Sequence, residues 1–180
     1  MKMDPNAQKI IEILEAAGET AWCVGGCVRD VLMGRTPNDW DIATSARPEA
    51  VKALFHKTFD TGLQHGTVTV LMGGSSYEVT TYRVEGPYYD GRHPSGVEFV
   101  DEVSGDLSRR DFTMNALAYN SQTGLVDICG GAEDIPRGGV RCVGEPDRRF
   151  QEDGLRILRA LRFSAVLGFA IEPKTAKSLR

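Results

Sequence analysis

The sequence predicts an α/β or α+β domain built on a mixed sheet, followed by helices. Helical and strand patterns alternate along the chain, which favours helices packed on a sheet. Two β-branched runs, Thr67 to Leu71 and Tyr77 to Val84, are separated by only a short Gly- and Ser-rich stretch and predict an antiparallel hairpin. A purely parallel βαβ arrangement would lack such a hairpin. With 180 residues, 41% of them hydrophobic, the chain can bury a core without disulfides.

The first 60 residues predict three helices and two strands. Asp4 and Pro5 suit a helix start and Gly18 a helix end, with apolar residues at helical spacing between them. The segments expected next are a strand at 21–24 that runs into Gly25-Gly26, a helix at 28–33, a strand at 38–44 and a helix at 48–55.

Beyond the hairpin, the pattern becomes more helical. Residues 86–96 are rich in Gly and Pro and predict a loop. We then expect a strand at 97–100, a helix at 107–119, a strand at 125–128, a Gly-rich connection at 130–144 and one long helix at about 146–167. Glu172-Pro173 begins another helix that the chain end interrupts, which suggests a fragment of a longer protein.

Composition narrows the class of protein. No apolar run approaches the ~20 residues that a membrane span needs, so we expect no membrane partner. The four cysteines form no C-x-x-C pair and the three histidines are scattered, so we do not expect a zinc site. Reduced cysteines are typical of cytoplasmic proteins, so we expect a cytoplasmic location. The net charge of −4 divides into +4 for residues 141–180 and −8 for the rest. This asymmetry fits an acidic, metal-binding front and a basic back that meets phosphates, and it fits an ordinary solvated helix face about as well.

Asp39 and Asp41 are the first candidate catalytic residues. Alternate side chains of a strand share a face, so the two carboxylates point the same way and Trp40 points the other way. Two such carboxylates repel each other, which raises one pKa or recruits a cation, and oxygen ligands of this kind suit Mg²⁺. A D-x-D pair alone is most often a surface feature.

The Gly25-Gly26 pair strengthens that interpretation. Glycines let the backbone approach a phosphate, and the start of the following helix offers unpaired N–H groups. Arg29, one turn later, reaches the same place. A strand–turn–helix corner without ligand is the plainer alternative, but 13 residues ahead of the paired carboxylates the motif forms a coherent site for a nucleoside triphosphate and metal.

Glu78 and a stripe of charged side chains on the long helix each have a functional interpretation and a purely structural one. Glu78 lies on the second hairpin strand and is either a third carboxylate facing the metals or a solvent-facing residue. On the long helix, side chains three residues apart form a stripe that either makes surface salt bridges or reads a nucleobase: Asp153, Arg156, Arg159 and Arg162.

Four motifs in order resemble the class II tRNA nucleotidyltransferases and bacterial poly(A) polymerases of the polymerase-β-like superfamily. They are Gly25 to Asp30, Asp39 to Thr44, Arg109 to Leu117 and Glu152 to Phe163, and together they span nearly the whole chain. The resemblance implies a nucleotidyltransferase head with a mixed, largely antiparallel sheet at residues 1–140 and the start of a helical neck at 141–180.

The resemblance also implies roles for residues. Asp39 and Asp41 look like ligands of catalytic Mg²⁺, and Gly26 and Arg29 match positions that contact the triphosphate. Arg110 and Asp111 match the segment that contacts the nucleotide and selects ribose. Asp153 and Arg156 correspond to a protein template that pairs with the base of CTP or ATP, with Arg159 and Arg162 supporting it. The stretch Tyr88 to Pro94 resembles the flexible loop that A-adding enzymes need.

CCA addition to the 3′ end of tRNA is the predicted reaction. The stretch from Gln64 to Val70 looks more like the CCA-adding branch than the poly(A) branch, whose equivalent is usually more basic. A-only addition or polyadenylation is the alternative within the family, and a catalytically silent nucleotide-binding module is the alternative outside it. We expect ATP, CTP and Mg²⁺ to bind and tRNA to bind weakly; the sequence does not predict the oligomeric state.

Overall fold

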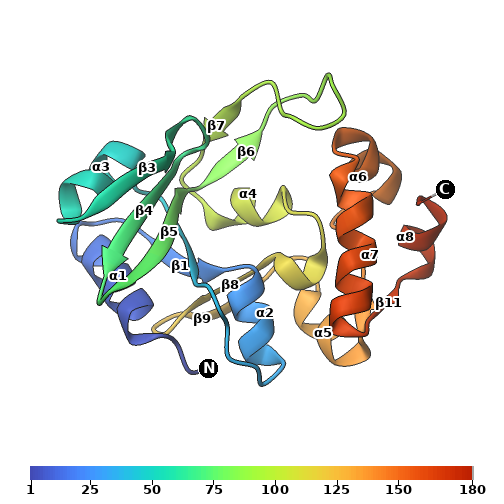
Figure 1. The fold of residues 1–180 in the computed structure, drawn as a ribbon, viewed down its shortest axis with the longest axis horizontal. Helices are drawn as coiled ribbons and strands as arrows, with labels where there is room; N and C mark the ends of the chain where they lie inside the picture. Colours follow the sequence, from blue (N-terminus) through green and yellow to red (C-terminus); the bar gives the residue numbers. More distant parts are fainter. Residues whose placement is uncertain (180) are drawn as a thin grey trace.

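Seven strands form one mixed sheet in the computed structural model, which describes residues 1–179 (Figure 1). Every neighbouring pair is antiparallel except β2 and β5, which run parallel. This arrangement confirms the predicted fold class. Across the sheet the order is β3 (Thr58–Gly62), β4 (Thr67–Met72), β5 (Ser75–Thr81), β2 (Asp41–Thr44), β1 (Ala21–Val24), β8 (Leu117–Asn120) and β9 (Gly124–Asp127).

Helices α1 (Pro5–Ala16) and α3 (Pro48–Leu54) cover one face of the sheet. Asp4 caps α1 by accepting a hydrogen bond from the Ala7 amide at 2.9 Å, and the apolar stripe that includes Ile10 and Leu14 is fully buried. These side chains pack against inward-facing residues such as Ile42 and Val79. The main core therefore fixes which face of β2 and β5 points away from it.

The opposite face is covered only in part. Helix α4 (Val103–Ser108) lies over β1, β2 and β8, where Leu107 packs in a small cluster with Val24, Ala43 and Ala118. Over β5, β4 and β3 the same face carries exposed side chains, among them Phe59, which is 55% exposed. The half-open face begins at β2, beside Asp41.

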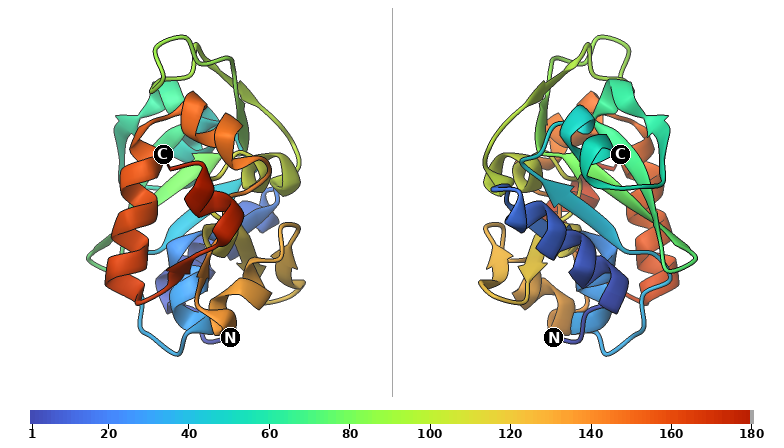
Figure 2. Two further views of the ribbon diagram at one scale, coloured as in Figure 1. Left: turned by 90° about the vertical axis from the view of Figure 1, so that its right-hand side faces the viewer. Right: turned by 90° about the vertical axis from the view of Figure 1, so that its left-hand side faces the viewer.

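The C-terminal helices stand together at one end of the molecule, away from β3 and β4 (Figures 1 and 2). A parallel pair of two-residue strands ties them to the head, and a separate ribbon of β6 and β7 carries loop 86–96. The bounds of these remaining elements are α2 (Gly26–Leu32), β6 (Arg83–Glu85), β7 (Val97–Phe99), α5 (Gly131–Arg137), β10 (Gly139–Val140), α6 (Pro146–Glu152), α7 (Leu155–Leu167), β11 (Ala170–Ile171) and α8 (Pro173–Lys177). None of the helices in residues 1–179 has the length and apolar content to cross a membrane.

The helix predicted at 107–119 is wrong. The chain ends α4 at Ser108, makes a short 3₁₀ turn at Thr113–Asn115 and enters β8 at Leu117. Leu107, Phe112 and Leu117 are all fully buried, but on different elements. Because residues 111–118 are all buried and have no solvent-facing side, their apolar residues imitate helical spacing without forming a helix.

The long helix predicted at 146–167 is also wrong, because it is two helices. Asp153, which separates α6 from α7, has an extended backbone with φ −145° and ψ 107°, and Gly154 follows it. Asp side chains compete for backbone N–H groups, and glycine favours helix poorly. Strand β3 and helix α5 were not expected: β3 faces solvent along most of its length, and α5 contains Pro136.

Candidate active site

A cavity of about 550 Å³ opens between the head and α7. Its walls come from the ends of β1 and β2, the start of α2, the segment from Arg109 to Asn115, and α7. Six arginines and five carboxylates line it. The structure brings together every site residue that the sequence predicts except Glu78: Gly25, Gly26, Arg29, Asp39, Asp41, Arg110, Asp111, Asp153, Arg156, Arg159 and Arg162.

Three carboxylates mark the edge of this cavity nearest the sheet. Asp41 begins β2 and is paired in register with Glu78 on the parallel strand β5, while Asp39 lies just before β2. Removal of water around Asp41 raises the pKa of its carboxyl, and the charges of Glu78 and Asp39 raise it further, against the opposing charge of Arg110. Glu78 is thus a close neighbour of Asp41, but its exposed side chain lies outside the cavity.

The donor set fits a hard divalent cation that also holds substrate oxygens. Among residues 1–179, no three Asp, Glu, His or Cys side chains meet closely enough to form a complete metal site. Mg²⁺ does not require one, since it usually binds through one or two carboxylates together with water and phosphate oxygens. The pKa of Asp41 is raised first by loss of hydration and then by the charges of Glu78 and Asp39, and a bound cation would favour the ionised carboxylate.

Gly25 shapes the floor of the cavity. Its φ of +77° is unfavourable for other residues, and a Cβ built there would lie 2.9 Å from Nη1 of Arg110. Arg29 rises from the next turn, where its guanidinium donates to Oδ1 of Asp30 at 2.8 and 2.9 Å and to Oδ1 of Asn115 at 2.7 Å. These bonds hold a largely buried cation beside the glycine turn.

Arg110 is oriented by a buried carboxylate behind it. Asp106 is fully buried and accepts from Nη2 of Arg110 at 3.0 Å and from Arg109 at 3.1 Å. Burial alone would raise the pKa of Asp106, but Arg109 and Arg110 outweigh it and hold the pKa below its usual value. The buried Nε of Arg110 has no hydrogen-bond partner in the structure. Asp106 therefore fixes the guanidinium of Arg110 at the wall of the cavity.

Four cavity residues were not singled out from the sequence: Glu85, Arg109, Asn115 and Phe163. Phe163 lies between arginines, with the guanidinium carbons of Arg29 and Arg159 at 5.4 and 5.1 Å from its ring centroid. Asn115 accepts the bond from Arg29. Spacing offers a signal for Phe163, one turn after Arg159 on α7, whereas nothing local in the sequence indicates the distant contact of Asn115.

The base-reading stripe is partly corrected by the break at Asp153. Only Arg156, Arg159 and Arg162 follow one another on α7, while Asp153 lies before the helix and accepts from the Leu155 amide at 2.9 Å. Arg159 donates to Oδ2 of Asp111 at 2.6 Å. Since the two lie 48 residues apart, this bond ties α7 to the head across the cavity.

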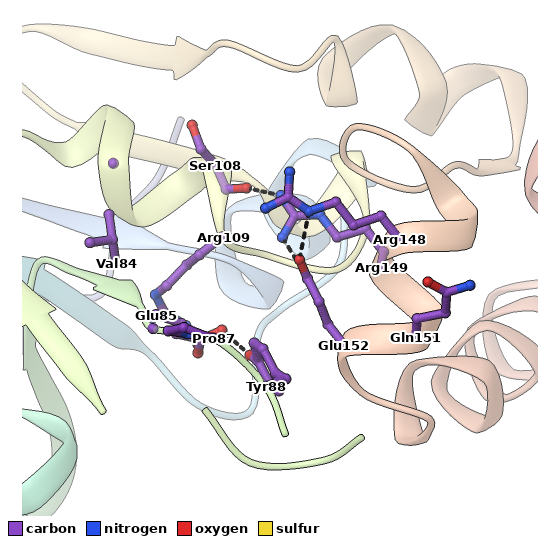
Figure 3. A pocket seen from close by; sticks show the side chains of 12 residues that line it. Val84, Glu85, Pro87, Tyr88, Ser108, Arg109, Arg148, Arg149, Gln151 and Glu152 are labelled. Atoms are coloured by element: carbon purple, nitrogen blue, oxygen red, sulfur yellow. Dashed lines mark hydrogen bonds and ion pairs between the residues drawn. The ribbon is translucent and has the colours of Figure 1, made fainter. Parts of the chain in front are cut away.

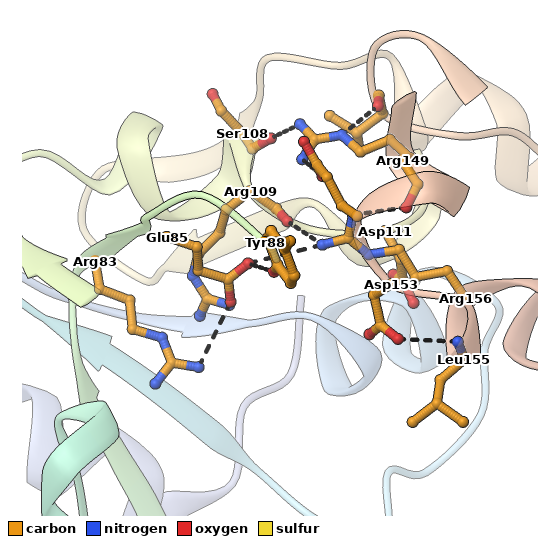
Figure 4. Close-up of polar contacts among 12 residues, drawn as sticks. Arg83, Glu85, Tyr88, Ser108, Arg109, Asp111, Arg149, Asp153, Leu155 and Arg156 are labelled. Atoms are coloured by element: carbon orange, nitrogen blue, oxygen red, sulfur yellow. Dashed lines mark hydrogen bonds and ion pairs between the residues drawn. The ribbon is translucent and has the colours of Figure 1, made fainter. Parts of the chain in front are cut away.

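Arg156 is held by several partners (Figure 4). It donates to Oε2 of Glu152 at 2.8 Å and to the carbonyl of Arg149 at 3.1 Å, and it lies 5.8 Å from the ring centroid of Tyr88. Tyr88 in turn donates to Glu85. Loop 86–96 also reaches the break between α6 and α7, where the Gly154 amide donates to the Gly91 carbonyl at 2.9 Å.

A second cavity, of about 680 Å³, lies between this loop, α4 and α6 (Figure 3). It shares Glu85 and Arg109 with the first cavity. Two of its three arginines are paired with Glu152, at 3.0 Å from Arg148 and 3.2 Å from Arg149. The aspartates that could hold a metal line only the smaller cavity, which is therefore the candidate active site.

Comparison with known proteins agrees with this geometry. A family model described as the poly A polymerase head domain matches residues 21–141. The chain is 55% identical over 174 residues to the CCA-adding enzyme of Leuconostoc mesenteroides, covering 97% of this chain and 43% of that protein. It is 51% identical over 170 residues to the CCA-adding enzyme of Geobacillus stearothermophilus, covering 94% of this chain and 42% of that protein.

Solved structures give the same result. The structure of the Bacillus stearothermophilus CCA-adding enzyme in complex with CTP matches with a TM-score of 0.90 and 47% identity, over 98% of this chain and 43% of that one. The Thermotoga maritima CCA-adding enzyme complexed with tRNA matches with a TM-score of 0.76 and 26% identity, over 98% of this chain and 42% of that one.

The chain thus spans less than half the length of the curated relatives it matches. Those relatives are nucleotidyltransferases, a class of enzyme that generally uses divalent metal ions. The family match covers most of the chain, and the identities are high over nearly all of it. The chain belongs to the poly A polymerase head domain family, in the group that contains the CCA-adding enzymes.

Proposed function

We propose that this chain is the catalytic part of a CCA-adding tRNA nucleotidyltransferase. It transfers CMP and AMP from CTP and ATP to the 3′ end of tRNA and releases pyrophosphate. The observation that carries the proposal is the single cavity in which paired aspartates, a glycine turn with its arginine, and the arginines of α7 converge. The identity to CCA-adding enzymes supports the choice of substrates.

Asp39 and Asp41 are the proposed ligands of Mg²⁺. When bound, the metal supplies positive charge that acidifies the attacking 3′-hydroxyl and neutralises the triphosphate. The two aspartates orient it at the cavity edge, and Glu78, beside Asp41, adds negative charge that strengthens the attraction for a cation. We assign Glu78 a supporting role in the approach of the hydroxyl.

The triphosphate is the proposed partner of the glycine turn. Gly25 and Gly26 leave room for phosphate oxygens, and Arg29 stands beside them with its orientation fixed by Asp30 and Asn115. Arg110, held by Asp106, faces the same space. Fixed cations stabilise the charge that develops on the leaving pyrophosphate, because they need no reorganisation during transfer.

Recognition of the base and ribose falls to the other end of the cavity. Asp153 and Arg156 are the proposed template for the base edge, with Arg159 and Arg162 supporting it. Asp111, which binds Arg159, is the proposed contact for the ribose, together with Arg110. In this conformation Arg156 is bound to Glu152, so reading a base requires part of that network to rearrange.

The same proposal divides the chain in function. Residues 1–140 form the head that performs transfer, and residues 141–180 begin a helical neck that carries the base-reading helix; the family match to residues 21–141 supports this division. We propose action in the cytoplasm, where the four cysteines stay reduced.

Incorporation of each nucleotide separately tests the assignment. The chain is given tRNA that ends before, after one and after two residues of CCA, with CTP, ATP, GTP or UTP alone. CCA addition predicts CMP on the first two substrates and AMP on the third, with no use of GTP or UTP. AMP incorporation alone would contradict CMP transfer and indicate an A-adding enzyme or a poly(A) polymerase. Mg²⁺–CTP binding without turnover, with the chain in large excess so that weak tRNA binding does not limit the rate, would indicate a silent module.

A further inference from the structure

A row of aligned side chains leads from the aspartates across the open half of the sheet. Asp41 on β2 is paired with Glu78 on β5, Glu78 with Thr69 on β4, and Thr69 with Phe59 on β3. Side chains of directly paired residues lie on the same face. At ~4.8 Å per strand, Phe59 stands roughly 14 Å from Asp41.

Contacts along this row confirm that it forms one surface. Thr61 and Thr69 share a hydrogen bond at 2.8 Å between their hydroxyls, and Thr67 and Thr80 share one at 2.9 Å. Phe59 is 55% exposed, although it is a large aromatic side chain. Among residues 1–179, no helix covers this part of the face, since α4 packs on the neighbouring strands.

The geometry of in-line transfer indicates which substrate binds to the open face of β5, β4 and β3. The attacking and leaving oxygens stand on opposite sides of the reacting phosphorus. The glycine turn and Arg29, proposed for the leaving pyrophosphate, follow β1 on one side of β2. The attacking 3′-hydroxyl must then come from the other side of β2, over β5, and the RNA behind it continues over β4 and β3.

We propose that this open face, defined by Glu78, Thr69, Thr61 and Phe59, binds the unpaired 3′ end of the RNA substrate, with a base stacked on Phe59. The inference rests on the proposed function. Glu78 repels phosphates, so the strand presents its bases and riboses to the sheet. Threonine hydroxyls match ribose 2′-hydroxyls, and an exposed ring is the usual platform for an unpaired base.

The test places the fluorescent base 2-aminopurine at each of the last four positions of a short RNA that ends before CCA. Fluorescence is measured on binding to the chain and to Phe59→Ala, Phe59→Leu and Phe59→Tyr. Leu lacks an aromatic ring but keeps the strand apolar, so it separates stacking from a loss of structure. Val166→Ala, at a side chain 67% exposed on α7, is the matched control.

We expect 2-aminopurine to be quenched at one position of the RNA. Phe59→Ala and Phe59→Leu should remove this quenching, whereas Phe59→Tyr and Val166→Ala should retain it. Affinity for the RNA falls roughly tenfold with the lost stack, while CTP affinity is unchanged. Quenching that is equal in all Phe59 variants, or no quenching with the unaltered chain, would contradict the proposed binding of RNA on this face. A dimer that Phe59→Ala dissociates in sedimentation overturns it in favour of a second copy of the chain. Absence of CTP binding or transfer by the unaltered chain would instead refute the proposed function.

Discussion

Asp41 carries an electrostatic cost that Arg110 offsets in part and a bound cation would offset further. Its carboxyl has a raised pKa because neighbouring protein atoms remove part of its hydration and because Glu78 and Asp39 lie nearby. A raised pKa in the folded state means that folding favours the protonated form, so stability falls as pH rises from the unfolded pKa through the folded one. Above that range the ionised carboxylate destabilises the metal-free fold.

Asp41→Asn should therefore stabilise the metal-free protein at neutral pH. Unfolding in denaturant, measured with a chelator present, should show a higher free energy for the variant at pH 7. The difference should close as pH falls to the ordinary pKa of an aspartate and below, because both proteins are then uncharged at this position. Mg²⁺ should stabilise only the unaltered protein. A variant that is less stable at every pH would contradict the electrostatic account.

Gly25 offers a second residue-scale prediction. Gly25→Ala adds a Cβ at 2.9 Å from Arg110 and imposes an unfavourable φ, so it should weaken CTP binding in a titration. Gly18→Ala is the matched control, since its φ of +88° is equally unfavourable but nothing lies within 4 Å. Both variants should lose about 1–3 kcal/mol of stability. If both also weaken CTP binding equally, Gly25 has no special place at the triphosphate.

At the scale of elements, loop 86–96 and the break between α6 and α7 act on each other. Tyr88 stacks on Arg156 and donates to Glu85, and Gly91 accepts from Gly154. The loop thus contacts both the residue proposed to read the base and the backbone next to Asp153. This contact connects a loop that resembles the one required for A addition to the proposed template.

Tyr88→Ala should slow AMP addition by roughly tenfold to thirtyfold, because it removes a cation–π contact and a hydrogen bond worth about 1 kcal/mol each. CMP addition should change much less. The neighbouring Tyr89, 84% exposed, provides the control variant Tyr89→Ala. Single-nucleotide extension of tRNA ending in CC, against tRNA lacking CCA, measures both rates. Equal effects of the two variants would show that Tyr88 does not support the template.

The elements also show how far the sequence predicts the structure. Capping, turn residues and alternation placed α1, β1, β2, α3 and the β4–β5 hairpin, because each signal is local. The break at Asp153-Gly154 was missed, since the Gly154 amide finds its partner in Gly91, 63 residues away. The motifs predicted residues that, except for Glu78, line one cavity, whereas the contacts of Asn115 and Phe163 with Arg29 arise only in the folded chain.

At the scale of the whole molecule, charge separates along the chain in a way that suits the proposed reaction. Residues 141–180 carry nine Lys and Arg against five Asp and Glu, and three of these arginines line the cavity from α7. The aspartates lie at its opposite, sheet-side edge. A local charge of only +4 should hold tRNA weakly and in a salt-dependent way.

Asp39 and Asp41 are the proposed metal end of a nucleotidyl-transfer site. Single-turnover transfer of labelled CMP to tRNA lacking CCA tests this role, with the chain in large excess so that weak tRNA binding does not limit the rate.

Asp41→Ala should lower this rate by about 10³-fold or more, since metal-assisted transfer depends on several kcal/mol of charge stabilisation. Its circular dichroism spectrum should be unchanged, and Asp101→Ala, at an exposed carboxylate on the surface, should retain full activity. A rate for Asp41→Ala within tenfold of the unaltered chain would contradict the role of Asp41 as a metal ligand in transfer.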